Sequence, residues 1–457
     1  MHLECAGWLS IEKSFTEAEL NRIAITIAIA AALLLSAIVV ATTPVGEGAK
    51  SRLAAAIAPV DDAWRAALPR DPEAATNAYV ARLSPEARAR SDIYFEGKYW
   101  LTVWNLLFTI ALMWLLLASR CSTAMRDFAG RLTRHKALQV MVYAALFSLI
   151  TWILGAPLGV YADFFREHQY GLANQTFWPW FGEQLIGLAV STVFTCLALA
   201  GIYAVIRRAP QTWWLWGSIV GLGLLMFGLL IGPVYIDPLF NKYQPLADGP
   251  VKASILSLAR ANGVPVNDVH EFDASKQTNR ISANVSGFLG TTAIRLNDNL
   301  LKRTTMPEIR GVMAHEIGHY VLNHIYKTLV IFGLILVIAL AFVRWIFPKA
   351  LARWGAGWGV RDVGDVAGFP LFIALFSAYM FLMTPFINTT IRTQEAEADL
   401  FAVNATGEPD GIAEVDLKLT EYRKVDPGPI EEFLLYDHPS PRNRIFAVMR
   451  WKAEQNK

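Results

Sequence analysis

The chain alternates between long apolar stretches and shorter polar blocks. A membrane-spanning helix needs about 20 apolar residues to cross roughly 30 Å of hydrocarbon. Six uncharged stretches are long enough: 23–46, 99–119, 137–162, 184–206, 209–236 and 366–391. A seventh, 328–343, is shorter, but we expect its helix to begin earlier because Tyr320, Val321 and Leu322 precede it and Lys327 can extend its amine to the interface. The pattern therefore predicts seven membrane spans.

The first stretch has one alternative, a cleaved signal peptide, because Lys13 and Arg22 precede it. Its apolar core is longer than the roughly 7 to 15 residues of a signal peptide, and acidic residues crowd the segment that should be basic. We therefore expect residues 1–46 to be an N-terminal segment that carries the first span.

Three polar blocks lie outside the predicted spans. Residues 47–98 indicate a short helical loop between spans one and two, and spans two to five fill 99–236. In the block 237–327, VKASILSLARANGV has helical spacing up to a stop at Asn262-Gly263, and TTAIRL alternates like a strand. Spans six and seven occupy 328–391, and the tail 392–457 could pack on the block 237–327. The predicted fold is a mainly α polytopic membrane protein with a small α+β domain.

The composition supports a membrane protein. Of the 457 residues, 54% are apolar and only 18% are charged, and the net charge is +2. These values exclude a disordered chain and give no sign of a nucleic-acid partner. Disordered chains and nucleic-acid-binding proteins both carry a higher density of charged residues. The three cysteines, Cys5, Cys121 and Cys196, are too widely spaced to indicate a disulfide framework or a cysteine metal cluster.

The segment MAHEIGHYVLNH contains a candidate metal site. His315 and His319 are four residues apart, so on a helix both imidazoles can reach one ion, with Glu316 beside them. Two imidazoles and one carboxylate suit Zn²⁺ and leave a fourth position for a water, from which Glu316 would take a proton. The alternative is an ordinary helix that happens to carry these residues, so a third ligand is needed.

The segment RTQEAEADLFA supplies the best candidate. Glu395 and Asp399 share a helix face, so one can coordinate zinc while the other accepts the second ring N–H of a ligand histidine. Spans six and seven form a hairpin, which returns Glu395 to the side and depth of His319. The alternative is a solvated acidic helix end. Glu397 points elsewhere on the helix, and His324 falls off the ligand face, where we expect a helix-interior or interfacial histidine.

HEIGH, followed after two membrane spans by EAEAD, closely resembles the type I CAAX prenyl protease family of integral-membrane zinc metalloproteases, and the chain is similar to its bacterial members. DPLFNKYQPLADGPVKASI, FREHQYGLANQTF and DHPSPRNR resemble other segments of that family, so the resemblance covers roughly residues 150–450. It implies about seven long helices around a large water-filled chamber capped by the metalloprotease domain. HExxH alone is shared by many unrelated peptidases.

The resemblance also implies roles for individual residues. His315, His319 and Glu395 would bind one Zn²⁺ per chain, Glu316 would act as general base and acid, and Asp399 would hold a ligand histidine from outside the metal site.

The resemblance also implies roles for three residues that lie outside these two motifs. His438 and Arg444 would stabilise the oxyanion and organise the metal site, although a helix start at the surface is the alternative for His438. Asn284 falls where the family has an edge strand that aligns the peptide by β-addition, but Val285 and Ser286 depart from the family pattern there. A plain hairpin strand is the alternative for Asn284.

The predicted function is therefore hydrolysis of peptide bonds by a metal-activated water at a membrane, similar to proteases that trim the C-terminal residues of prenylated proteins. The alternatives are a divalent-metal transporter and a non-cleaving scaffold for membrane quality control. We expect a monomer that acts on peptide or protein substrates, and the residues leave their prenylation open. The protein would lie in the inner or plasma membrane of a bacterium, or in an endoplasmic-reticulum-type membrane of a eukaryote. Basic loops on both sides leave its orientation open.

Overall fold

The computed structural model describes residues 57, 60–286 and 292–455, and this part of the chain is mainly helical. Within these residues, six helical segments are long and apolar enough to cross a membrane. They contain α5 (Pro85–Ala118), α7 (Lys136–Gly159), α9 (Phe177–Arg208), α10 (Trp213–Ile231), α14 (His324–Trp358) and α15 (Phe369–Thr406). Six of the seven predicted spans are thus confirmed, and the first, 23–46, lies outside the described residues.

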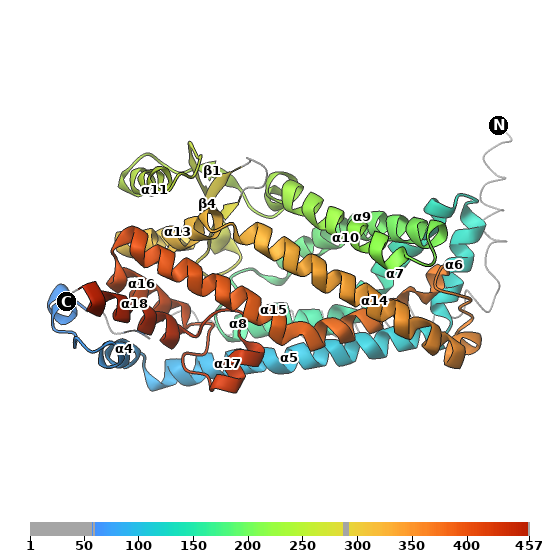
Figure 1. Ribbon diagram of the computed structural model, residues 1–457, viewed down its shortest axis with the longest axis horizontal. Coiled ribbons are helices and arrows are strands. Elements are labelled where there is room, and N and C mark those ends of the chain that lie inside the picture. Colours follow the sequence, from blue (N-terminus) through green and yellow to red (C-terminus); the bar gives the residue numbers. More distant parts are fainter. Residues whose placement is uncertain (1–56, 58–59, 287–291, 456–457) are drawn as a thin grey trace.

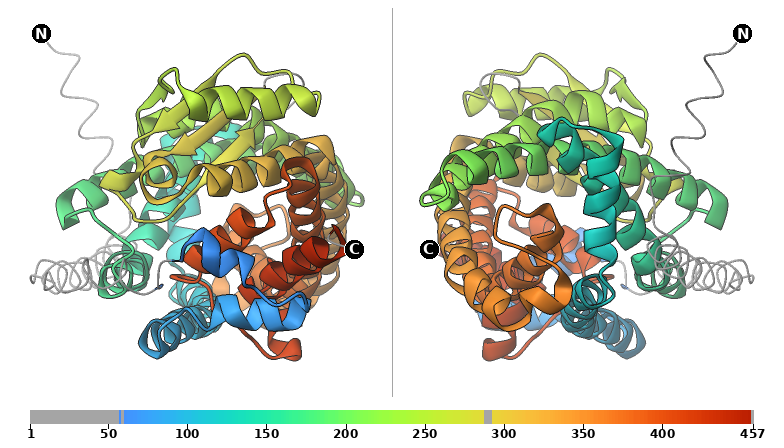
Figure 2. Two further views of the ribbon diagram at one scale, coloured as in Figure 1. Left: turned by 90° about the vertical axis from the view of Figure 1, so that its left-hand side faces the viewer. Right: turned by 90° about the vertical axis from the view of Figure 1, so that its right-hand side faces the viewer.

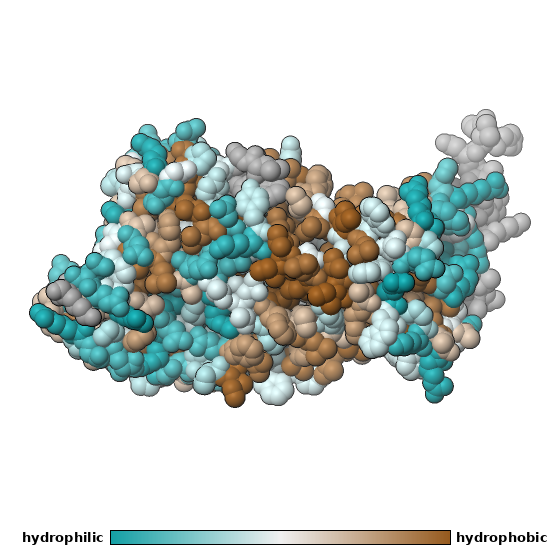
Figure 3. Space-filling model, in the orientation of Figure 1, coloured by the Kyte–Doolittle hydropathy of each residue, from teal (hydrophilic) through white to brown (hydrophobic). Residues whose placement is uncertain are grey.

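The long helices run roughly along one common axis. The strands and most of the shorter helices lie toward one end of it, whereas α6 (Cys121–Leu132) lies at the other end (Figures 1 and 2). Large apolar side chains such as Val330, Leu334 and Leu382 are exposed on these helices. The space-filling view shows an apolar band across the middle of the molecule, with hydrophilic surfaces at both ends (Figure 3). This is the distribution expected of helices that face lipid.

Two helices differ in extent from the predicted spans. The helix α5 begins at Pro85, well inside the polar block 47–98, with Ser84 as N-cap: its hydroxyl accepts a hydrogen bond from the amide of Ala87 at 3.1 Å. The prediction that residues 320–322 begin the sixth span is wrong. They end α13 (Met306–Val321), and α14 begins at His324 because Asn323 adopts a left-handed conformation, with φ 58°, that stops the first helix.

A four-stranded sheet forms the centre of the part that we name the polar domain. Its strands are β1 (Tyr243–Pro245), β2 (Val269–Phe272), β3 (Ala283–Ser286) and β4 (Ala293–Asn297), in the order β1-β2-β4-β3. The pair β2 and β4 is parallel, and the other two pairs are antiparallel. The helix predicted for VKASILSLARANGV is α11 (Pro250–Ala261), which ends at Ala261. The strand predicted for TTAIRL is β4. As an edge strand, β3 leaves one row of backbone groups outside the ladder.

The helix α13 lies against both α15 and α16 (Pro409–Leu419). Two glycines allow this close approach: a Cβ at Gly311 would lie 2.7 Å from Ile412, and one at Gly318 would lie 3.0 Å from Phe401. The polar domain also contains α3 (Asp62–Ala66), α4 (Pro72–Val80), α12 (Asp298–Arg303), α17 (Pro429–Leu435) and α18 (Pro441–Gln455). Helices α16 and α18 contribute buried side chains to the apolar cluster of this domain.

The remaining short elements connect the long helices. They are α6 (Cys121–Leu132), α8 (Arg166–Gln169), the π-helical turns Val160–Phe165 and Gly232–Ile236, and the 3₁₀ turns Asp237–Leu239, Ala274–Lys276 and Val366–Gly368. The two largest clusters of buried apolar residues lie apart: one in the polar domain, and one around α6 and the helix ends beside it. The metal-site candidates lie on α13 and α15, beside the first of these clusters. The large chamber stays a prediction of the resemblance.

Candidate metal centre

Three potential metal ligands converge where α13 meets α15. The Nε2 atoms of His315 and His319 are 3.0 Å apart, and the Glu395 carboxylate lies 3.1 Å from the first and 3.4 Å from the second. Donor atoms that share one tetrahedral zinc ion at about 2.0–2.1 Å are themselves about 3.3 Å apart. The buried Glu395 Oε2 accepts no hydrogen bond from any described residue. The arrangement therefore fits a cation between the three side chains.

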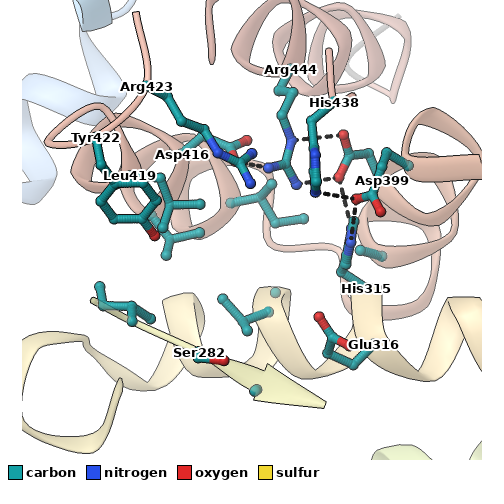
Figure 4. Close-up of a pocket in the computed structure, with 18 residues that line it drawn as sticks. Ser282, His315, Glu316, Asp399, Asp416, Leu419, Tyr422, Arg423, His438 and Arg444 are labelled. Atoms are coloured by element: carbon teal, nitrogen blue, oxygen red, sulfur yellow. Dashed lines mark hydrogen bonds and ion pairs between the residues drawn. The ribbon is translucent and has the colours of Figure 1, made fainter. Parts of the chain in front are cut away.

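Hydrogen bonds behind His315 fix the orientation of its ring. Its Nδ1 lies 2.8 Å from Asp399 Oδ1, and Arg444 donates to both oxygens of Asp399, at 2.8 and 2.5 Å (Figure 4). On its other side, Arg444 Nη1 lies 3.1 Å from Asp416. With Nδ1 engaged by the carboxylate, Nε2 is left free to bind a metal.

The electrostatics of this group favour a positive charge at the centre. Burial lowers the pKa of His315, but its hydrogen bond to Asp399 and its close approach to the Glu395 carboxylate outweigh burial and raise this pKa to about 10. Burial also raises the pKa of Asp416 to about 6, against the opposing effect of Arg444. The pKa of Arg444 is raised, because its carboxylate partners outweigh its burial.

A second set of hydrogen bonds holds His319, and it includes a residue that the sequence did not place in the site. The Nδ1 atoms of His319 and His324 are 2.8 Å apart, and His324 Nε2 lies 3.0 Å from Glu397, which also pairs with Lys327. This network assigns Nδ1–H of His319 as donor to His324, and Nε2–H of His324 as donor to Glu397. His324 is buried, as expected, but it orients a candidate ligand because the break at Asn323 turns it back toward α13.

Because His324 holds the ring of His319, His324→Ala is expected to weaken zinc affinity by about 10- to 100-fold, the usual cost of losing a residue that orients a metal ligand. Competition with a chromophoric chelator would measure the affinity. His135→Ala, an exposed histidine outside the polar domain, is the matched control and should leave affinity unchanged. Equal zinc affinity in the His324 variant and the wild type would contradict the role of His324.

Glu316 and His438 line one cavity of about 170 Å³, together with His315 and Glu395. Glu316 lies on α13, and His438 stands on the opposite wall, with its Nε2 3.3 Å from Glu395 Oε2 (Figure 4). Burial raises the pKa of Glu316, so its carboxylate holds a proton more readily than an exposed glutamate. Burial likewise lowers the pKa of His438. The cavity thus places a proton-accepting group beside the metal ligands.

Arg444 lines the cavity with its charge already paired, since it hydrogen-bonds to Asp399 and forms an ion pair with Asp416. Asn284 lies on the edge strand β3, as expected, opposite Arg295 of β4. Its neighbour Ala283 lines the cavity, whereas Asn284 itself is not among the lining residues. The Oδ1 atom of Asn284 is buried and finds no hydrogen-bond partner among the described residues.

Comparison with known proteins agrees with this geometry. A family model described as "CAAX prenyl protease N-terminal, five membrane helices" matches residues 70–242, and the model of peptidase family M48 matches residues 245–452. An uncharacterized metalloprotease, YhfN of Bacillus subtilis, is 28% identical over 79% of this chain and 85% of its own. CAAX prenyl protease 1 of Saccharomyces cerevisiae is 28% identical over 68% of this chain and 72% of its own.

The fold has a counterpart among solved structures. The crystal structure of S. mikatae Ste24p aligns with a TM-score of 0.62 over 95% of this chain and 99% of that chain, at 21% identity. The two family models together cover most of the sequence, and their membrane and peptidase parts correspond to the long helices and the polar domain described above. The chain belongs to the CAAX prenyl protease 1 family of membrane metalloproteases, within peptidase family M48.

Proposed function

We propose that this membrane metalloprotease binds one Zn²⁺ per chain through His315, His319 and Glu395, and cleaves peptide bonds near the C terminus of prenylated proteins. The observation that carries the proposal is the convergence of two imidazoles and one carboxylate in a cavity that Glu316 also lines. All of these groups come from a single chain, so a monomer is sufficient.

When bound, zinc supplies an electrophile that polarises the peptide carbonyl and lowers the pKa of a coordinated water. The chain's residues handle the protons. Glu316 accepts the proton of the attacking water and then transfers it to the leaving amine, in one hydrolytic step without a covalent intermediate. His438, on the opposite wall, donates a hydrogen bond to the oxyanion. Arg444 acts indirectly, because it holds Asp399 against His315.

Substrate would lie along the edge strand β3. Residues Ile281 and Ala283 line the catalytic cavity, whereas Val285 and Ser286 line a second cavity of about 650 Å³ that also contains His319 and Glu395. An extended peptide added to this edge would therefore pass from one cavity to the other across the metal ligands.

The second cavity supports a lipid-modified substrate. Most of its lining surface is apolar and comes from α10 and α14, with Leu225, Leu229, Leu230 and Phe332 among the lining residues. Its volume would hold much of an isoprenoid chain. Several relatives bear the name CAAX prenyl protease, which agrees with such a substrate.

The same geometry argues against a metal transporter. Transport sites lie near the middle of the bilayer on broken helices. Here His315 and His319 lie on α13 in the polar domain, and Glu395 lies toward the C-terminal end of α15. A transport site also has no use for Glu316 as a proton acceptor. An intact proton acceptor argues equally against a non-cleaving scaffold.

Purified, zinc-loaded protein in detergent should cleave a prenylated peptide faster than the unprenylated peptide of the same sequence. The physical reason is burial of the isoprenoid, at about 25 cal/mol per Å² of apolar surface, in the second cavity. Mass spectrometry identifies the cut bond, and kcat/KM compares the two peptides. Equal kcat/KM for both peptides would show that prenylation is not recognised, while the hydrolase assignment would remain.

A further inference from the structure

The short helix α17 turns its apolar side chains outward and its charged side chains inward. A helix on a water-facing surface does the opposite, with charged residues outside and apolar residues against the core. The two glutamates of α17 are partly buried. Its apolar side chains are the exposed ones: Ile430 by 73%, Phe433 by 53%, and Leu434 and Leu435 by 38% each. We name these four residues the apolar face of α17.

Hydrogen bonds from the glutamates fix this orientation of α17. Glu431 accepts from the Tyr99 hydroxyl on α5 at 3.0 Å and from the Lys424 ammonium at 2.9 Å. Glu432 accepts from the backbone amide of Ser440 at 2.8 Å. These bonds hold the charged side of the helix against the protein. The apolar face is therefore directed outward by specific contacts on the opposite side.

The contacts of α17 place it at the depth where two spans meet the polar domain. Tyr99 begins the uncharged stretch of α5, and Arg392 is the first charged residue after the uncharged stretch of α15. Arg392 Nη1 donates to the Glu432 carbonyl at 2.9 Å, and the Asn388 side chain donates to the Leu434 carbonyl at 2.9 Å. A membrane–water interface falls where spans pass from apolar to polar sequence. The helix α17 therefore lies at the level of that interface.

The apolar face continues the surface that the spans present to lipid. On α5, Trp100 directly follows Tyr99 and is exposed, as is Trp104 one turn further along. Tryptophan is enriched at membrane interfaces, where its ring meets both lipid and water. The space-filling view shows apolar residues at the lower edge of the molecule, where Figure 1 places α17 (Figure 3). The same bilayer that covers the exposed side chains of α5 therefore covers the apolar face.

The helix leads directly to a wall of the catalytic cavity. His438, which lines that cavity, follows the last residue of α17 by three positions. Between them Tyr436 is buried, with its ring 4.7 Å from that of Phe95 on α5. On the far side of His438, Ser440 is bonded to Glu432 of α17. The segment that carries His438 is thus tied to α17 on both sides.

We propose that α17 lies in the membrane interface with its apolar face among the lipid acyl chains, and that this contact holds the segment carrying His438 in place. Interfacial helices bury their apolar face roughly 5–10 Å into the boundary between headgroups and acyl chains. The hydrogen bonds to α5 and α15 already hold α17 at this level, so a helix of seven residues suffices. The lipid contact goes beyond the proposed peptidase function and does not require it, whereas its effect on His438 rests on that function.

Spin labels on α17 test the lipid contact. A single cysteine is introduced as Ile430→Cys or Phe433→Cys into the full chain, with the native cysteines replaced by alanine, and the labelled protein is placed in phosphatidylcholine nanodiscs. Molecular oxygen concentrates among acyl chains and a nickel chelate stays in water, so the ratio of their collision rates with the label reports lipid exposure. At both positions this ratio should be several-fold higher than for Arg260→Cys, an exposed position on α11 in the polar domain. It should approach the ratio for Leu382→Cys, an exposed position on α15.

Two results would overturn the lipid contact. Oxygen-to-nickel ratios at Ile430 and Phe433 that equal the ratio at Arg260 would place the apolar face in water. Immobile labels that neither reagent reaches would show that a protein surface, a second copy or another chain, covers this face instead. Both positions are exposed, so the labels should leave the fold intact, and an unchanged thermal unfolding midpoint verifies this for each variant.

A charge on the apolar face tests the link to His438. Phe433→Glu should lower kcat/KM for peptide cleavage in nanodiscs several-fold, up to the 10²- to 10³-fold typical of losing one oxyanion donor, because the charged α17 leaves the interface. Phe433→Leu keeps the face apolar and should cleave like the wild type, and zinc content should be equal in both variants. Equal kcat/KM in the two variants would overturn the link to His438. Failure of zinc-loaded wild type to cleave any peptide would remove the proposed function, while the spin labels would still decide the lipid contact.

Discussion

Glu316→Gln is expected to lower kcat/KM for peptide cleavage by about 10²- to 10⁴-fold, the usual contribution of a general base, while zinc remains bound. The amide is nearly isosteric with the carboxylate but cannot accept the proton of the attacking water. Glu316 is not one of the three converging ligands, so its loss leaves the metal-binding atoms in place. Peptide cleavage assays and elemental analysis of the same preparation measure the two effects.

Glu86→Gln is a suitable control, because Glu86 is exposed in the first turn of α5 and the substitution makes the same chemical change. It should leave both cleavage and zinc content at the wild-type level. Full activity in a zinc-bound Glu316→Gln preparation would refute the role of Glu316. Loss of zinc from that variant would mean that the carboxylate contributes to metal binding.

His315→Ala is expected to lose zinc and cleavage together. Removing this imidazole deletes one of the three ligands. It also takes away the hydrogen-bond partner of Asp399 and the ring that Glu395 faces. Zinc at about 1,000 times its dissociation constant would stabilise the wild type by ~4 kcal/mol, and this stabilisation should disappear in the variant. Elemental analysis and thermal unfolding with and without added zinc would measure the loss.

Chelator-treated wild type provides the comparison for this variant. Readdition of zinc should restore cleavage and thermal stability to the stripped wild type, because all three ligands are present. The same addition should have no effect on His315→Ala. A variant that retains zinc and activity would show that His315 is not a ligand.

Much of the fold could be predicted because membrane helices and metal motifs leave strong local patterns. Uncharged stretches located six of the spans, and the spacing of His315, His319 and Glu395 about a helical hairpin anticipated their convergence. These inferences need only helix periodicity and the return of a hairpin to the same side of the membrane.

The residues that the sequence did not reveal depend on tertiary contacts. His324 reaches His319 only because Asn323 interrupts the helix with a left-handed turn. Asp416 has no motif of its own and meets Arg444 through the packing of α16 against α18. Local periodicity cannot report such contacts.

The division of the metal ligands between α13 and α15 has a consequence for biogenesis. The α14–α15 hairpin separates the two imidazoles from the carboxylate, so a nascent chain that ends before α15 offers an ion only two of the three ligands. Tight metal acquisition must therefore wait until the last hairpin has inserted into the bilayer. Hydrolytic competence would then arise only in fully integrated molecules, and a chain stalled during synthesis would be unable to digest its neighbours.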